Sequence, residues 1–459
     1  MSILVIDIGT TNVKSALFSM AEKPADSPGQ AEPVWSAVES KDIQQIPMLP
    51  NKNPRIFEFN AEEIFAETDK LISGYCQTNK GIEGLVFSTQ MHGCVYPDRA
   101  RGMHVYLSWQ DTRCLDPVPG TSESPLDRLG RLLGPGELVP SGVPVKPALA
   151  FANLYAMSCT DPRWKDLYSD MEIFTLGSYL IWRLTGRNIT HISNAAPMGM
   201  ADVRKGEWLR DLWKKAGLGG IKHPEIVCDL KSCGEFNRNG MTIKVYPDIG
   251  DQQVSILGCG VKEGDVIVNA ATAGQVIRVN GAFVPGDYEI RPFFNGMYLD
   301  VVSRMPAGRS FDVLIDFISE TGRKFFGVSL SRGEIWKKLR NGCRIGEDTG
   351  GLEGNIGFFD LPNREAGGAL THIMHHNFTP DNVISAFLKD AAELYGMYCK
   401  KFLGSPQKGR LVFCGGLAGH WPDFSNAILR RFDVKPESKV VEGESHKGMG
   451  CIASMAAGS

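Results

Sequence analysis

Short apolar runs separated by turn-forming residues mark the beginning of the chain. Residues 3–8 are Ile-Leu-Val-Ile-Asp-Ile, the pattern of a buried strand with one carboxylate near its end. Residues 9–12, Gly-Thr-Thr-Asn, follow, and apolar residues return over 13–18. Because glycine and asparagine are favoured in tight turns between strands, this order predicts an antiparallel hairpin over residues 3–18.

Helical spacing then alternates with strand-like runs. Asn60 suits a helix N-cap, Glu63 completes a capping-box pattern, and apolar residues follow at intervals of three and four. A second long helix is predicted after Thr379-Pro380, which suit the N-cap and first-turn positions. The pattern further predicts strands over 82–88, 104–108, 266–270, 275–279 and 411–414, and helices over 173–184 and 208–216.

The hairpin pattern occurs twice in the chain. Residues 266–279 repeat the strand–turn–strand order of residues 3–18 with little identity. Strands and helices alternate between the two hairpins, with polar clusters at strand ends, which is how α/β enzymes place their sites. The length of 459 residues also suits more than one domain. We therefore expect two related α/β domains, residues 1–250 and 251–459.

Composition narrows the functional classes. A net charge of −3 and the absence of a basic block argue against nucleic acid or an anionic membrane as a partner. The 11 cysteines form no C-x-x-C pair, so reduced thiols are expected rather than zinc ligands. No signal-peptide pattern begins the chain, and no apolar run approaches the ~20 residues of a membrane span. We expect a soluble, cytoplasmic protein, and the sequence leaves its oligomeric state open, a homodimer included.

Polar segments in a particular order carry a resemblance to a known family. They are Asp7-Ile8-Gly9-Thr10-Thr11-Asn12, Gln90-Met91-His92-Gly93, Trp109-Gln110-Asp111-Thr112-Arg113-Cys114, the YLIWRLTG of residues 179–186, Gly250-Asp251-Gln252-Gln253, Thr272-Ala273-Gly274 and Gly415-Gly416-Leu417-Ala418. Each segment alone is a weak signal. Together, in this order over nearly the whole chain, they resemble the FGGY carbohydrate kinases of the actin-like ATPase superfamily.

The resemblance implies two RNase H-like domains that face an interdomain cleft, and phosphorylation of a sugar hydroxyl by ATP with Mg²⁺. Asp251 stands where the family keeps its catalytic aspartate, so it is expected to take the proton of the sugar hydroxyl. The alternative is an ordinary turn residue, because Gly-Asp pairs favour turns.

Nucleotide-binding roles are implied for both halves. Asp7 is expected to orient the water shell of Mg²⁺, or else to be satisfied by its own hairpin turn. Phosphate binding is expected from Gly9, Thr10, Thr11 and Asn12 and from Thr272 and Gly274, and adenosine binding from Gly415, Gly416 and Leu417. The alternatives are an ordinary strand turn and an ordinary strand-to-helix loop.

The expected sugar-binding residues are Gln90, Met91, His92, Trp109, Asp111, Arg113 and Gln252. His92 would bond a hydroxyl and Trp109 would stack on the sugar, although both residue types are common in cores. Asp111 and Arg113 are expected to bond further hydroxyls or a distal phosphate-like group, or else to pair with each other. Q-M-H-G resembles xylulokinases and W-Q-D-x-R-C resembles sedoheptulokinases, which favours a ketose. Glycerol is disfavoured, because glycerol kinases carry an Arg-Glu pair where Met91 and His92 stand.

The second phosphate segment departs from the family pattern. Ala271 and Ala273 stand where Gly-Thr-Ser/Thr-Gly is more usual, and His420 stands where many members carry Asn. This departure motivates a second hypothesis, a catalytically weak sugar or nucleotide sensor on the same fold. A third hypothesis is an actin-like ATPase without a sugar substrate. Q-M-H-G argues against it, because a polymerising ATPase needs no polar pocket at that strand end.

Overall fold

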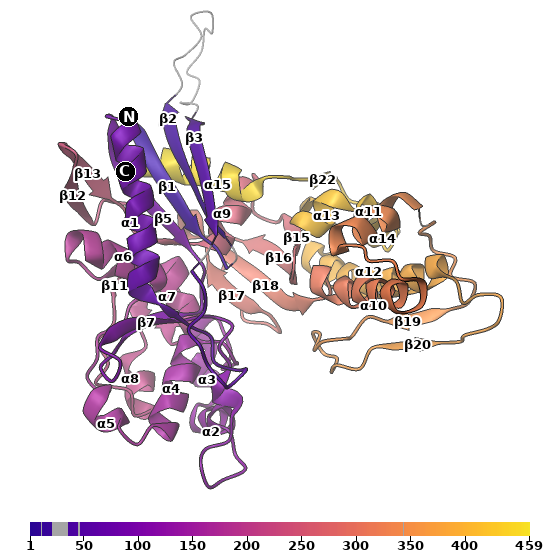
Figure 1. The fold of residues 1–459 in the computed structure, drawn as a ribbon, viewed down its shortest axis with the longest axis horizontal. Coiled ribbons are helices and arrows are strands. Elements are labelled where there is room, and N and C mark those ends of the chain that lie inside the picture. Colours follow the sequence, from indigo (N-terminus) through magenta and orange to yellow (C-terminus); the bar gives the residue numbers. More distant parts are fainter. Residues whose placement is uncertain (11, 21–34, 45, 343) are drawn as a thin grey trace, which may run out of the picture. The chain divides into compact units, whose positions relative to one another are not determined.

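The computed structural model describes residues 1–459 except 11, 21–34, 45 and 343 (Figure 1). The chain forms two compact units. The first unit consists of Met1–Gly258, Phe283–Gly296 and Ser445–Ser459, and the second unit consists of Cys259–Ala282 and Met297–Glu444. This arrangement differs from a single division at residue 250, because two later segments of the chain return to the first unit.

A mixed β-sheet forms the centre of the first unit. Its strands lie in the order β12 (Gly234–Arg238), β13 (Met241–Val245), β5 (Ile82–Thr89), β1 (Ser2–Ile8), β2 (Asn12–Met20) and β3 (Trp35–Gln44), with β14 (Ile249–Gly250) also paired to β5. β1 runs antiparallel to β2 and parallel to β5. The hairpin predicted over residues 3–18 is confirmed.

Helices cover both faces of this sheet. Alternate residues of β1 point to opposite sides, and the apolar residues on both sides are buried. Leu4, Ile6 and Ile8 share a hydrophobic core with α1 (Ala61–Thr78) and α6 (Leu176–Thr185). Figure 1 shows α1 along this face and α15 (Glu444–Ala457) on the other.

The second face is closed by α15 and α9 (Asp251–Gly258). The ring centroids of His446 and Phe18 lie 5.5 Å apart. A Cβ atom on Gly448 would lie 2.0 Å from the carbonyl oxygen of Val254, so glycine is needed where α15 crosses α9. The last segment of the chain is therefore part of the packing of the first unit.

Local sequence signals predict some helix ends correctly and other helix ends incorrectly. The Asn60 side chain accepts hydrogen bonds from the backbone of Glu62 and Glu63, which confirms the predicted N-cap of α1. The helix predicted over 173–184 begins later, at Leu176, because Phe174 bridges to Val95 and Thr175 is the N-cap.

The first unit also contains elements outside this sheet. They are β4 (Glu58–Asn60), β6 (Cys94–Asp98), β7 (Met103–Leu107), η1 (Arg113–Leu115), α2 (Pro125–Leu132), α3 (Pro135–Leu138), η2 (Val139–Ser141), α4 (Ala150–Thr160), α5 (Trp164–Leu167), β8 (Ile189–His191), α7 (Ile192–Met198), β9 (Ala201–Asp202), β10 (Glu207–Trp208), α8 (Arg210–Lys215), β11 (Glu225–Val227), β17 (Glu289–Pro292) and η3 (Phe294–Gly296). The helix predicted over 208–216 is shorter, because Trp208 pairs with Ala201 in a strand.

The second unit repeats the strand relations of the first. Its strands lie in the order β18 (Tyr298–Met305), β16 (Gly274–Asn280), β15 (Val266–Ala270), β21 (Leu411–Cys414) and β22 (Ser438–Val440). β15 is antiparallel to β16 and parallel to β21, as β1 is to β2 and β5. The predicted repeat of the hairpin is confirmed.

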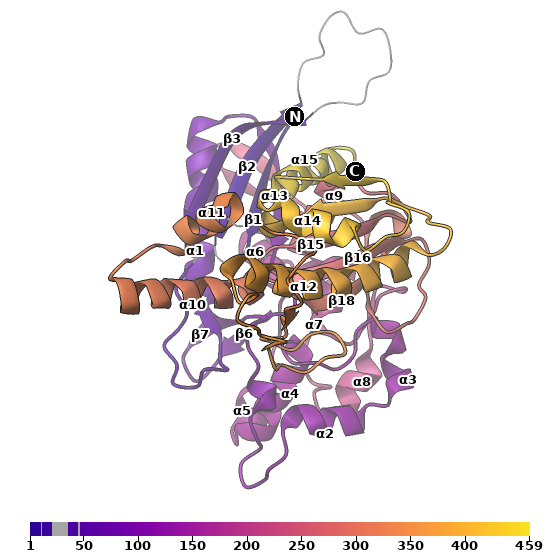
Figure 2. The same ribbon diagram turned by 90° about the vertical axis from the view of Figure 1, so that its right-hand side faces the viewer.

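One long helix packs on this second sheet. α12 (Pro380–Leu403) contacts β15, β16 and β18, and Thr379 caps it as predicted (Figure 2). The other elements are α10 (Gly308–Phe326), α11 (Arg332–Gly342), β19 (Glu353–Asn355), β20 (Ala369–Thr371), α13 (Gly416–His420) and α14 (Pro422–Leu429). Within the described residues, no helix is long and apolar enough to cross a membrane.

Candidate active site

Asp251 is the first residue of α9 and directly follows β14. The alternative of an ordinary turn at Gly250-Asp251 is contradicted, because the chain passes there from a strand into a helix. β14 pairs in parallel with the end of β5, where Gly250 lies opposite Thr89. A Cβ atom on Gly250 would lie 2.5 Å from the Met91 sulfur, so a larger residue would displace the Met91 side chain. This pairing sets Asp251 beside the segment that follows β5.

The Asp251 carboxyl has a raised pKa. Burial, reinforced by the negative charge of Asp7, raises the pKa of Asp251 to about 7. The Gln252 backbone N–H donates to Oδ1 at 2.8 Å, and this bond together with the charge of Arg291 opposes the rise. A carboxyl with a pKa near the working pH is suited to accept a proton in catalysis.

Asp7 lies near the end of β1, with 8% of its surface exposed. The Ser88 hydroxyl, on the neighbouring strand, donates to its Oδ1 at 2.6 Å. Burial raises the pKa of Asp7, and the Ser88 bond and Lys14 oppose this rise. The carboxylates of Asp7 and Asp251 have little positive charge close to them, so a cation would be stabilised beside them.

A cation bound beside these carboxylates would keep part of its water shell. Among the described residues, no group of three or more His, Cys, Asp or Glu side chains could hold a metal. Mg²⁺ takes one or two carboxylates and keeps several waters, whereas protein-enclosed ions need more ligands. The residues present therefore fit hydrated Mg²⁺ held by Asp7.

The first predicted phosphate loop connects β1 and β2. The Gly9 N–H donates to the Asn12 carbonyl at 3.1 Å, and the Thr10 hydroxyl accepts from the Trp109 indole N–H at 3.0 Å. Thr11 lies outside the described residues. The Trp109 side chain is exposed and adjoins this loop, so it is not a core residue.

The segment after β5 lies against the same loop and against α9. Gln90 is buried, and its amide nitrogen lies 3.4 Å from the Gly9 carbonyl oxygen. Met91 packs on Gly250. The structure therefore brings Gln90 to the first phosphate loop and Met91 to the strand before Asp251.

His92 is held as a neutral imidazole. Its Nδ1 lies 3.0 Å from the Pro197 carbonyl oxygen, and because a carbonyl can only accept, Nδ1 carries the proton. Burial, with the positive charges of Lys146 and Arg291, keeps the pKa of His92 well below its usual value. Its Nε2 is then a hydrogen-bond acceptor, the form that can bind a hydroxyl donor.

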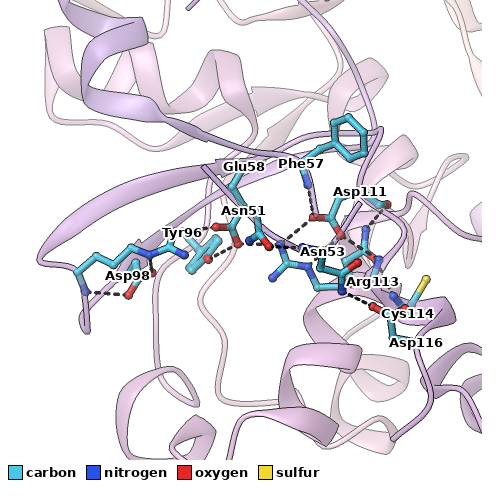
Figure 3. Close-up of polar contacts among 12 residues, drawn as sticks. Asn51, Asn53, Phe57, Glu58, Tyr96, Asp98, Asp111, Arg113, Cys114 and Asp116 are labelled. Carbon is cyan, nitrogen blue, oxygen red and sulfur yellow. Dashed lines mark hydrogen bonds and ion pairs between the residues drawn. The ribbon is translucent and has the colours of Figure 1, made fainter. Parts of the chain in front are cut away.

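Asp111 and Arg113 pair with each other inside the first unit (Figure 3). Arg113 Nε and Nη2 donate to the Asp111 carboxylate at 2.9 and 2.7 Å, and Nη2 also lies 2.7 Å from Glu58 Oε1. Asp111 further accepts from the Phe57 backbone N–H. Of the two alternatives for this pair, the structure shows the internal ion pair, which ties residues 57–58 to residues 111–113.

A polar cluster that the sequence analysis did not single out adjoins Gln252. Arg291 Nη1 donates to Gln252 Oε1 at 2.5 Å, and Nη2 donates to Glu289 Oε2 at 2.7 Å. Lys146 donates to the other Glu289 oxygen at 2.5 Å. Arg291 and Lys146 hold the pKa of Glu289 well below its usual value. The sequence signal for this cluster is the alternating Glu-x-Arg of β17, and it does not indicate that Arg291 contacts Gln252.

The other predicted nucleotide-binding residues lie in the second unit. Thr272 is in the β15–β16 turn, and its carbonyl accepts from the Arg309 N–H at the start of α10. Gly274 opens β16, where a Cβ atom would lie 2.0 Å from the Tyr395 hydroxyl. The second predicted phosphate segment is thus packed against α10 and α12.

Gly415 and Gly416, in the predicted adenosine segment, lie next to the turn between β15 and β16. Gly415 has φ of +87°, and a Cβ atom there would lie 2.5 Å from the Ala270 carbonyl oxygen. A Cβ atom on Gly416 would meet no atom within 4 Å, and Leu417 lies in α13. Gly415 therefore brings this segment to the end of β15, while Gly416 leaves open space beside it.

Residues 163–262 match the sequence model of the FGGY family of carbohydrate kinases, N-terminal domain. The chain is thus similar to the FGGY carbohydrate kinases over these residues. It is 24% identical over 242 residues to a glycerol kinase of Nocardia farcinica, which covers 50% of this chain and 47% of that one. It is 24% identical over 289 residues to a xylulose kinase of Bacillus subtilis, covering 60% and 53%. The chain thus spans about half the length of the curated relatives it matches.

Solved structures of xylulose and glycerol kinases share the fold. A xylulose kinase from Rhodospirillum rubrum aligns over 100% of this chain and 89% of its own, with a TM-score of 0.78 and 16% identity. The Plasmodium falciparum glycerol kinase with ADP aligns over 99% and 89%, with a TM-score of 0.75 and 14% identity. The expected α/β fold is confirmed, and it is the fold of these kinases.

Proposed function

We propose that the protein is an ATP-dependent carbohydrate kinase that phosphorylates a hydroxyl of a ketose or related polyol. The observation that carries the proposal is the Asp251 carboxyl at the junction of β14 and α9, whose pKa is about 7. His92 and Gln252 supply hydrogen-bonding groups near it. The related kinases named for xylulose and glycerol support the substrate class.

In the proposed reaction, Asp251 accepts the proton of the substrate hydroxyl. The hydroxyl oxygen forms a bond to the γ-phosphorus of ATP, and the bond between that phosphorus and the β–γ bridging oxygen breaks. The bridging oxygen keeps the electron pair and leaves as ADP. Asp7 would hold Mg²⁺ through its water shell, and the ion would neutralise charge on the phosphates. The Nε2 of His92 accepts a bond from a second substrate hydroxyl and so orients the sugar.

Nucleotide binding is assigned to the glycine and threonine segments. In the first unit, Gly9, Thr10, Thr11 and Asn12 are proposed to bond phosphate oxygens. In the second unit, Thr272 and Gly274 are proposed to bind phosphate, with Gly415, Gly416 and Leu417 against the adenosine. Small residues allow backbone N–H groups to approach an anion.

The test is ADP release measured across a panel of ketoses, aldoses and polyols with ATP and Mg²⁺. We expect at least one ketose to stimulate release, and Asp251→Asn to reduce the rate by about 10²–10⁴-fold. Because the base must be ionised, kcat/KM should rise about tenfold per pH unit below pH 7 and level off above it. If no sugar stimulates release, the kinase proposal fails. An Asp251→Asn variant as fast as the parent would remove Asp251 from its role.

A second candidate, a sugar or nucleotide sensor, is favoured by Ala271 and Ala273 in the second phosphate segment. Calorimetric titration distinguishes it from the kinase. Binding of a sugar or ATP with micromolar affinity, combined with no sugar-stimulated ADP release, would support the sensor. Release with a turnover of a few per second or more would exclude it.

A further inference from the structure

The residue before Asp251 is a glycine, so its backbone needs contacts with other segments to stay in one conformation. β14 has only two residues, and its pairing with β5 ends at Gly250. On α7, the Ser193 hydroxyl oxygen accepts from the Gly250 N–H at 3.0 Å. This bond fixes the backbone directly before Asp251 through a segment that lies far from it in sequence.

The direction of the Ser193 hydroxyl is set by His191, the N-cap of α7. The Ser193 backbone N–H lies 3.2 Å from His191 Nδ1, and because a backbone N–H can only donate, Nδ1 is an acceptor. Burial lowers the pKa of His191 to about 4, so the imidazole is neutral at pH 7. The Ser193 hydroxyl lies 2.8 Å from the same Nδ1 and therefore donates to it. Its oxygen is then oriented to accept from Gly250.

His191 is held in turn by a carboxylate three residues before Asp251. The His191 backbone N–H donates to Asp248 Oδ1 at 3.1 Å. Asp248 Oδ2 accepts from the hydroxyls of Thr175 and Thr190, at 2.8 and 3.2 Å, and from the Asn194 amide nitrogen at 2.7 Å. Burial raises the pKa of Asp248 to about 6, and these bonds oppose the rise. The carboxylate thus joins the start of α6, β8 and α7 to the segment before β14.

These contacts form a closed ring inside the first unit. Asp248 holds the His191 backbone, and the His191 ring holds the Ser193 hydroxyl. Ser193 holds Gly250, and the backbone of residues 248–250 closes the ring. Burying a carboxylate costs free energy that an apolar side chain of similar size would not cost. The fully buried Asp248 is therefore explained by the donors that it orients and not by packing.

We propose that Ser193 is a positioning residue: oriented by His191 and Asp248, it holds the Gly250 backbone and thereby fixes the position of the Asp251 carboxyl. The inference rests on the proposed function and extends it to the residues that hold the base. Ser193 acts through the backbone of Gly250 and not on the substrate.

The primary test compares Ser193→Ala with the parent. Alanine keeps the backbone N–H that His191 caps, which favours folding, but it leaves the Gly250 N–H without its acceptor. The measurements are kcat and KM for ADP release with the sugar that gives the parent its highest rate. We expect kcat to fall by about 10–100-fold, because a misplaced base slows proton transfer, and KM to change by less than about threefold. A parental kcat would overturn the proposal.

Hydrogen exchange gives a readout that needs no substrate. In the parent, the Gly250 amide is protected by its bond to Ser193. We expect peptides that cover residues 248–254 to exchange about tenfold faster in Ser193→Ala, since local opening becomes easier when this bond is lost. Exchange at the parental rate in these peptides would show that Ser193 does not hold the segment.

Ser15→Ala is the matched control for both measurements. Ser15 is also buried in the first unit, and its hydroxyl donates to the Lys41 carbonyl at 2.8 Å and lies 3.1 Å from the Tyr75 hydroxyl. We expect its kcat, and its exchange over residues 248–254, to equal those of the parent. Equal changes in Ser15→Ala and Ser193→Ala would indicate general loosening of the unit and would overturn the proposal.

Variants of His191 and Asp251 separate positioning from a purely structural role. His191→Ala removes the acceptor that orients the Ser193 hydroxyl, so kcat should fall as in Ser193→Ala. His191→Asn keeps an N-cap oxygen that can accept from Ser193 and should recover most of this loss. In an Asp251→Asn background, Ser193→Ala should no longer lower kcat, since its effect passes through the base. An equal loss with and without the Asp251 carboxylate contradicts the proposal.

The outcomes also separate this inference from the proposed function. If the parent releases ADP with a sugar and Ser193→Ala keeps the parental kcat, the kinase stands and the inference fails. If no sugar stimulates ADP release but exchange over residues 248–254 rises in Ser193→Ala alone, the kinase fails and the anchoring of Gly250 by Ser193 stands. If neither ADP release nor faster exchange is seen, both fail.

Discussion

At the scale of the residue, acidity in the first unit follows from how each carboxyl is partnered. Asp251 and Asp7 are enclosed without a direct cationic partner among their described hydrogen bonds, and burial raises both pKa values. Glu289 is equally enclosed but contacts Arg291 and Lys146, and its pKa is lowered. The presence of a cationic partner, more than burial alone, distinguishes a carboxyl with a structural role from a carboxyl that is suited to accept a proton.

The raised pKa of Asp251 has a consequence for stability. The ordinary value is 3.8 and the folded value is about 7. Between these values the folded state binds more protons than the unfolded chain, so stability falls as pH rises through the window and stays low above it. Asp251→Asn removes this cost. We expect the variant to melt at a higher temperature than the parent at pH 8, with a gain on the order of 1–4 kcal/mol that vanishes near pH 4.

Thermal melts without nucleotide, at intervals from pH 4 to 8, measure this difference. Asp161→Asn is the opposite control, because Arg163 lowers the pKa of Asp161 and the variant should lose stability at pH 8. A parent that is more stable than Asp251→Asn at pH 8 would show that the carboxylate is compensated in the folded protein.

For the pair of Asp111 and Arg113 we predict a loss of stability, in contrast to the gain predicted for Asp251→Asn. Arg113→Leu leaves the fully buried Asp111 carboxylate without its main partner, and breaking a buried pair in this way costs about 3–5 kcal/mol. We expect chemical denaturation to show this loss, and the double variant Asp111→Leu/Arg113→Leu to lose less. A stable Arg113→Leu protein whose KM for sugar rises more than tenfold would instead assign Arg113 to the substrate.

At the scale of the element, close approaches of backbone position the candidate site. β14 can pair with the end of β5 because Gly250 leaves room for Met91. In the second unit, Gly274 leaves room for the Tyr395 hydroxyl, which is buried and has no hydrogen-bond partner among the described residues. Each glycine lets a strand end meet the next layer of the fold.

Gly274→Ala tests this packing. Its Cβ atom would lie 2.0 Å from the Tyr395 hydroxyl and 2.8 Å from the Met305 carbonyl oxygen, so β16 must shift. We expect a loss of about 1–3 kcal/mol in denaturant melts, together with weaker ATP binding by calorimetry. Tyr395→Phe removes one of the two clashes and should recover part of both losses. An alanine variant with parental stability would mean that β16 adjusts freely.

Sequence patterns predicted the elements better than the site. The hairpin over residues 3–18 and the caps at Asn60 and Thr379 depend on local chemistry, and all three are confirmed. The turn alternative for Asp251 rested on Gly-Asp as a local turn signal, whereas the pairing of β14 with β5 decides the conformation there. The contact of Arg291 with Gln252 joins positions 39 residues apart, so no local pattern reveals it.

At the scale of the whole molecule, the path of the chain links the two units. The chain passes from the first unit to the second after Gly258, returns over Phe283–Gly296, and returns finally over Ser445–Ser459. The first return supplies Glu289 and Arg291, and the second supplies most of α15, with buried Met449 and Ile452. The candidate site of the first unit thus includes residues of the first return, and the packing of its sheet includes residues that follow the whole of the second unit in sequence.

Removal of residues 445–459 should therefore destabilise the first unit more than the second. The loss exposes the apolar sheet face formed by Ile3, Val5 and Phe18, which α15 helps to cover. Hydrogen exchange should show faster exchange in β1 and β2 and little change in β15 and β21. Equal acceleration in both sheets would show that the units unfold as one.

The late return of α15 also has a consequence during protein synthesis. When residues 1–258 have left the ribosome, one face of their sheet still lacks the helix made from residues 445–457. At about 5–20 residues per second, this apolar face waits on the order of ten seconds or more for its cover. We expect the nascent chain to need chaperone protection in that interval, and a ribosome stalled near residue 440 to present a species prone to aggregation.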